Sequence, residues 1–108
     1  MPDLLFQQLS TVQSSLQSPP QTLASSTVLS LTTFITFLTG QTPITTVNPP
    51  VTGSHMLVLI FTGTVVVNQL VAGTGLGQFK RSITPVQNIP VILFFDQVSG
   101  LYWPLNGT

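Results

Sequence analysis

Short apolar runs, none of them long enough for a membrane-spanning helix, most constrain what this chain can fold into. The longest are "MLVLIF" at 56–61 and "PVILFF" at 90–95, and they lie between segments rich in Gly, Pro, Thr and Asn. A spanning helix needs about 18 consecutive apolar residues, so we expect none. Short runs separated by turn residues about every dozen positions are typical of an all-β sandwich or barrel-like domain.

Alternating apolar and hydroxyl side chains predict that the strands begin near Ser25. Residues 25–40 fit one strand, or two strands with a kink at Phe34. The side chains assigned to the apolar face are Leu29, Leu31, Ile35 and Phe37. Those assigned to the polar face are Ser30, Thr32 and Thr36.

The rest of the chain divides into further strands at its turn residues. A Thr-rich strand with Ile44 and Val47 should stop at Pro49-Pro50, because proline has no N–H to donate to a sheet. After a turn at Gly53, residues 56–61 are apolar on both faces, so we expect both faces to be buried. Other strands are expected at 64–70, 79–87, 89–96 and 101–105, with a glycine-rich loop at 72–78 and a turn at 97–100.

Residues 3–17 have a helical rather than a strand-like pattern. Apolar side chains recur at spacings of four, three and four, which predicts a short amphipathic helix ended by "SPP" at 18–20. The stripe consists of Leu5, Leu9, Val12 and Leu16. It would pack on its own domain, bundle with its copies, or dock on a larger assembly. We therefore divide the chain into an N-terminal helix or extended arm with its linker, 1–24, and a β-sandwich domain, 25–108.

The chain has very few charges. Only Asp3, Lys80, Arg81 and Asp96 carry one, and the charged fraction is 4%, where a soluble domain has about 25%. A formal net charge of zero favours association with copies or with another protein. Without a basic excess we expect no nucleic-acid partner, and without a spanning segment no membrane partner.

Few residues could carry out chemistry. The two carboxylates lie far apart in the sequence, and His55 is the sole imidazole, so we predict no catalytic, cofactor-binding or metal-binding residues. His55 is expected to be a strand-start residue beside a turn, although three copies could bring three imidazoles together at an axis. Tyr102 and Trp103 form a possible ligand surface for a sugar, with hydrophobic anchoring of the last strand as the alternative.

Residues 34–105 resemble a known module. "FLTGQTPITTVNPPVTGSHMLVLIFTG", a glycine-rich loop and "ITPVQNIPVILFFDQVSGLYWPL" are together similar to a module of tailed-phage structural proteins, found in spikes, head fibres and capsid decoration proteins. The similarity depends on short, mostly apolar motifs. Its residues are Ile44, Val47, Pro49, Pro50, Gly53, Leu57, Leu59, Phe61, Val91, Leu93, Phe95, Asp96, Tyr102 and Trp103.

The resemblance implies an all-β, jelly-roll-like β-sandwich assembled as a homotrimer on the outer surface of a phage virion, with no enzyme activity. A chain of this size would be a capsid decoration (cement) protein that clamps subunits of the major capsid protein, with the Leu5-to-Leu16 stripe as the contacting arm. The trimer interface would be formed by Leu57, Leu59, Phe61 and Phe95. The alternatives are a receptor- or glycan-binding spike module, and a composite enzymatic site between chains around His55 and Asp96.

Overall fold

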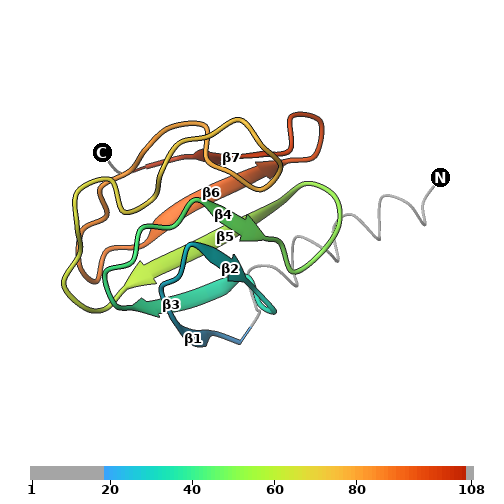
Figure 1. The fold of residues 1–108 in the computed structure, drawn as a ribbon. Coiled ribbons are helices and arrows are strands. Elements are labelled where there is room, and N and C mark those ends of the chain that lie inside the picture. The colour runs from blue at the N-terminus through green and yellow to red at the C-terminus, as the bar shows by residue number, and fades with distance from the viewer. Residues whose placement is uncertain (1–18, 107–108) are drawn as a thin grey trace.

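The computed structural model describes residues 19–106, and within this range the chain is all-β (Figure 1). The described part contains no helix that is long and apolar enough to cross a membrane. Its strands are β1 (Gln21–Ala24), β2 (Val28–Ser30), β3 (Ile35–Thr39), β4 (Thr46–Asn48), β5 (His55–Phe61), β6 (Val91–Asp96) and β7 (Leu101–Pro104).

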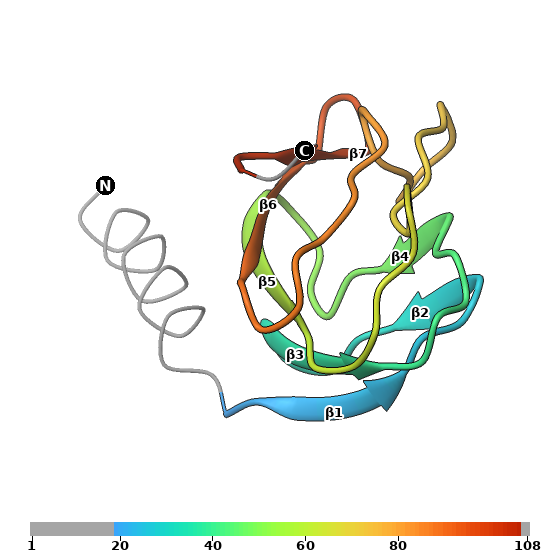
Figure 2. The ribbon, with the colours of Figure 1, turned by 90° about the vertical axis from the view of Figure 1, so that its left-hand side faces the viewer.

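The strands form a mixed five-stranded sheet and a small two-stranded sheet. The order of the large sheet is β1-β3-β5-β6-β7: β1, β3 and β5 are parallel, while β6 and β7 are antiparallel to their neighbours. β2 pairs in parallel with β4 in the second sheet. From β1 to β5 the chain thus alternates between the two sheets. In Figure 2 the large sheet is curved, and β2, β4 and the connection 62–90 cover its concave face.

The core lies between these layers. One side chain in two along β5 and β6 points inward, which is the period expected of strands with one face packed on a core. The core cluster consists of Leu29, Leu31, Leu38, Ile44, Val47, Leu57, Leu59, Phe61, Leu70, Phe79, Ile83, Val91, Leu93, Phe95 and Tyr102.

Several predicted strands are confirmed, but those at 64–70 and 79–87 are wrong. Residues 62–90 form an irregular connection that contains no named strand. It has isolated bridges instead, such as Leu70 with Ile44 and Phe79 with Tyr102 of β7. Side chains satisfy part of its backbone: the Asn68 N–H donates to Thr84 Oγ1 (2.9 Å), and the Ala72 N–H to Ser82 Oγ (3.0 Å). These side-chain hydrogen bonds supply backbone partners where a regular strand ladder would otherwise do so.

The predicted boundary at residue 25 also needs correction. Residues 21–24, assigned to the linker, form β1 and pair with β3 over Thr36–Thr39. The β domain therefore begins at Gln21. The predicted helix at 3–17 lies outside the described residues.

Two predicted faces differ from the structure. Bends at 32–34 separate β2 from β3 and shift the alternation, so Thr36 and Leu38 are buried while Ile35 and Phe37 are only half-buried. The Thr36 hydroxyl is satisfied there, because Gln21 Nε2 donates to its Oγ1 (3.2 Å). In β5 only one face is fully buried, and Met56 on the other face is exposed.

Candidate functional site

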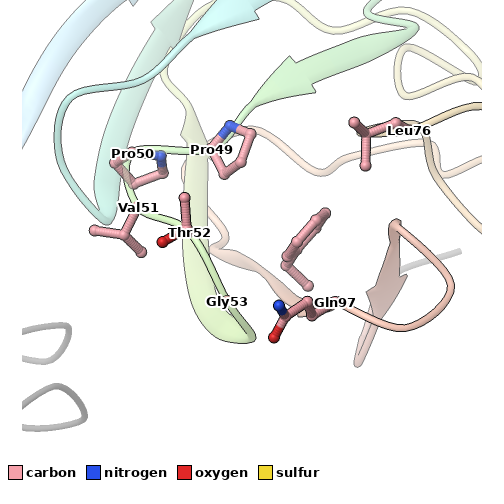
Figure 3. Close-up of a pocket in the computed structure, with 8 residues that line it drawn as sticks. Pro49, Pro50, Val51, Thr52, Gly53, Leu76 and Gln97 are labelled. Carbon is pink, nitrogen blue, oxygen red and sulfur yellow. The ribbon is translucent and has the colours of Figure 1, made fainter. Parts of the chain in front are cut away.

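A pocket of about 500 Å³ lies at the end of the large sheet where β5 begins and β6 ends. Three loops meet there: the β4–β5 loop, the glycine-rich loop and the β6–β7 turn. In Figure 3 the Leu76 side chain stands across the opening from Val51. The lining residues are Pro49, Pro50, Val51, Thr52, Gly53, Leu76, Phe95 and Gln97.

The β4–β5 loop forms one wall of this pocket. Pro49-Pro50 ends β4, and Gly53, with a φ of 87°, turns the chain into β5 in a conformation that favours glycine. The Gln97 N–H donates to Ser54 Oγ (3.1 Å), which ties the start of the β6–β7 turn to this loop. Gly53 is therefore the turn residue that the sequence predicts.

The glycine-rich loop is held in place at Gly77. Its N–H donates to the Gly100 carbonyl oxygen (2.7 Å), and its own carbonyl oxygen accepts from the Val47 N–H (2.8 Å). A Cβ atom at Gly77 would lie 2.6 Å from the Val47 carbonyl oxygen, and φ here is 79°. Only glycine fits without a shift of the backbone. This anchor places Leu76 beside the pocket.

An aromatic cluster that contains His55 adjoins the pocket through Phe95. The His55 ring stacks on Phe95 (5.1 Å between centroids) and meets the edges of Phe34 (5.9 Å) and Tyr102 (6.2 Å). His55 Nδ1 lies 2.8 Å from the Gly53 carbonyl oxygen, which can only accept, so Nδ1 carries the proton. His55 Nε2 and the Tyr102 hydroxyl are buried and have no hydrogen-bond partner within the part of the chain that the structure describes.

Burial sets the ionisation of the cluster. Desolvation lowers the pKa of His55 below its ordinary 6.5, and the hydrogen bond to Gly53 only partly opposes this. Burial likewise raises the pKa of the Tyr102 phenol far above 10.0. Both groups are therefore neutral near pH 7, and the cluster is an apolar support for Phe95.

Asp96 belongs to the turn. Its Oδ1 accepts from the Val98 N–H (3.1 Å) and its Oδ2 from the Ser99 N–H (3.4 Å). These hydrogen bonds, with the Val98 N–H first, lower the pKa of its carboxyl. Within residues 19–106 no group of three or more His, Cys, Asp or Glu side chains comes together.

The pocket, with its mostly apolar lining, is suited to binding an apolar side chain or a short segment, and the Gln97 amide lies at its margin.

The structure places the four predicted trimer-interface residues inside the single chain. Leu57, Leu59, Phe61 and Phe95 are at most 5% exposed. A second copy approaching this sheet would instead meet the alternate side chains of β5 and β6, because successive residues of a strand point to opposite faces. His55 is buried within the single chain as well.

The two residues predicted to form a ligand surface differ in burial. Tyr102 is fully buried, whereas Trp103 is 39% exposed. Lys80 Nζ lies 5.2 Å from the Trp103 ring centroid, and Trp103 Nε1 donates to Ser99 Oγ (3.4 Å). The predicted arm, Leu5, Leu9, Val12 and Leu16, lies outside the described residues. The sequence analysis did not predict the pocket. The single leucine of the glycine-rich loop was the one signal in the sequence that could have identified Leu76 as a lining residue.

No family model, curated protein or solved structure matches this chain. The fold and the pocket define a class only in general terms: a small all-β chain with an apolar pocket at one end of a mixed sheet.

Proposed function

We propose that this chain is a non-enzymatic structural protein of a phage virion. It forms a homotrimeric, jelly-roll-like capsid decoration (cement) protein that clamps neighbouring subunits of the major capsid protein on the outer capsid surface. The observation that carries the proposal is the exposure of apolar side chains around the pocket, which suits a surface that is covered in an assembly.

The exposed side chains belong to the loops that form the pocket. Val98, in the β6–β7 turn, is 96% exposed, and Leu76 is 76% exposed. The two loops are in contact, because Gly100 binds the backbone of Gly77 and packs under Leu76. An apolar side chain of a partner could enter the pocket while these tips contact its surroundings. Such burial excludes water and needs no charged pair.

A clamp needs a second point of attachment. The N-terminal segment supplies it in this proposal, with Leu5, Leu9, Val12 and Leu16 against the major capsid protein. The sequence resemblance to phage structural modules supports the choice of partner. A protein that binds only the assembled shell stabilises it by mass action.

The test compares capsids carrying variants of two exposed regions. We expect Leu76→Asp with Val98→Asp to detach from capsids, because a carboxylate buried in an apolar contact is costly. Capsids without the protein should rupture at a lower temperature. The matched control is Val67→Asp, since Val67 is 78% exposed and follows the opposite end of β5. Full attachment of the double variant would overturn the pocket contact, and unchanged heat resistance of bare capsids would overturn the cement role.

The second candidate is a receptor- or glycan-binding module of a head fibre or spike, which the exposed Trp103 beside Lys80 favours. Here Trp103→Ala is expected to abolish adsorption to host cells while capsids stay as heat-resistant as before. Tyr102 is left unchanged in this test because it is part of the core. Normal adsorption of the Trp103 variant would exclude this candidate.

A further inference from the structure

The outer face of the five-stranded sheet is apolar across four strands. Along β3, β5 and β6 the side chains of this outer face are half-buried or exposed, whereas those of the inner face are buried. The apolar side chains of this outer face are Ile35, Phe37, Met56, Val58, Ile60, Ile92, Phe94 and Trp103.

The strand registers align these side chains in rows. Val58 lies between Ile35 on β3 and Ile92 on β6. Phe94 lies between Met56 on β5 and Trp103 on β7. Directly opposed residues of neighbouring strands point to the same face, so each row is continuous. A continuous apolar face in a chain with so little charge is an aggregation hazard unless something covers it.

The chain itself offers a cover of suitable length. Residues 1–18 precede the described part, and the sequence predicts an amphipathic helix over 3–17. Fifteen helical residues span about 22 Å. The seven residues of β5 span about 23 Å. The helix and the central strand are therefore matched in length.

The point of entry also suits this sheet. The described chain begins at Pro19, two residues before β1, which is the first strand in the order of the large sheet. The linker Ser18–Pro20 reaches about 10 Å when extended. That is about two strand spacings of 4.8 Å, enough to carry the segment from β1 toward β5.

We propose that, in the free protein, residues 1–18 lie across the outer face of the sheet of the same chain. The apolar side of the predicted helix would contact the rows of apolar side chains on the sheet through Leu5, Leu9, Val12 and Leu16. Gln7 and Ser14, on the opposite side of that helix, would face water. A segment joined by a short linker is present at millimolar effective concentration, which favours it over a second copy in dilute solution. The proposed virion role uses the same four side chains, so the segment would leave the sheet on attachment to a capsid; the contact in the free protein does not require that role.

Cross-linking tests the proposal directly, because the chain has no cysteine of its own. The full chain carrying Val12→Cys and Val58→Cys is treated with a short bismaleimide in dilute solution, and the products are separated by mass. We expect a link within one chain, formed several-fold more than in the control pair Ser14→Cys and Val58→Cys. Links mainly between chains would show that a second copy covers the face. Equal linking of the two pairs, or no linking, would also overturn the proposal.

A second measurement leaves the sheet unaltered. Trp103 is the only tryptophan of the chain and lies on the outer face, so its fluorescence reports whether that face is covered. We expect Leu9→Ser with Val12→Ser to shift its emission to longer wavelength and to increase quenching by acrylamide. The control, Gln7→Ser with Ser14→Gln, should behave as the unmodified chain. Identical spectra for all three proteins would overturn the contact.

Discussion

At the scale of single residues, His55 is a group whose protonation its surroundings oppose. Its ring is buried among Phe34, Phe95 and Tyr102, and only Nδ1 has a hydrogen bond. A proton on Nε2 would create a buried charge with no hydrogen-bond partner among the described residues. The neutral ring is tolerated because it packs as an aromatic side chain.

Stability should therefore fall on mild acidification. The pKa of His55 is below 6.5 in the folded protein, so the unfolded chain takes up the proton first. The contribution of His55 to the free energy of unfolding is fully present above pH 6.5. It is lost as the pH falls from there through the folded-state pKa. One group gives a slope of at most about 1.4 kcal/mol per pH unit.

Urea unfolding at pH 7.5, 6 and 5 measures this loss. His55→Phe should remove the dependence in that range, because phenylalanine does not titrate. Asp96 does not interfere, since its pKa is lowered from 3.8 and its contribution is lost at more acidic pH. An equal slope in the variant and the unmodified protein would contradict the assignment to His55.

The buried hydroxyl of Tyr102 should be dispensable for folding. It is unsatisfied within the described residues, so Tyr102→Phe removes a desolvation penalty and should raise the free energy of unfolding by about 1 kcal/mol. Gln69, also fully buried, is the matched contrast: it accepts from the Val66 N–H (3.1 Å) and donates to the Gly40 carbonyl oxygen (3.2 Å). Gln69→Leu should cost about 1–3 kcal/mol. Equal destabilisation of the two variants in urea would refute the distinction.

At the scale of elements, Gly77 links β4 to the β6–β7 turn. Gly77→Ala should lower the free energy of unfolding by about 1–3 kcal/mol, because its φ is positive and its Cβ would press on the Val47 carbonyl oxygen. Gly63→Ala is the control, since nothing lies within 4 Å of its Cβ position. It should change stability by less than about 1 kcal/mol. Equal thermal shifts for the two variants would argue against the Gly77 anchor.

Elements with strong local signals were predictable. The apolar runs gave β5 and β6, and Pro49-Pro50 and Gly53 gave the end of β4 and the turn that follows. Residues 64–70 and 79–87 have strand-like composition. Their hydrogen bonds, however, run to side chains elsewhere in the connection 62–90 and to distant segments, and do not form a ladder. Sequence pattern shows which residues are suited to a strand and does not show which partner strands are available.

The same limit applies to the candidate site. Its walls come from loops brought together by long-range contacts, such as Gly77 with Gly100 and Gln97 with Ser54. The apolar character of Leu57 and Phe95 was plain, but whether they face a core or a partner depends on the layer that covers them. Here 62–90, β2 and β4 supply that layer within one chain.

At the scale of the whole molecule, packing and hydrogen bonds rather than charge should determine stability. Between residues 19 and 106 only Lys80, Arg81 and Asp96 carry a formal charge. The thermal midpoint should therefore hardly change between about 0.05 and 0.5 M sodium chloride, where screening alters exposed charge pairs. Ammonium sulfate should raise it by strengthening apolar burial. A marked shift at low sodium chloride would contradict this expectation.

The parallel pairing of β1 with β3 has a mechanical consequence. The chain enters the sheet through β1, a strand of four residues in register with Thr36–Thr39. Hydrogen bonds between parallel strands run across the strand axis. A pull on the N-terminus along that axis would load them together, in shear, whereas a pull at right angles would open them one after another. The direction of tension would thus decide how firmly the N-terminal segment stays joined to the β domain.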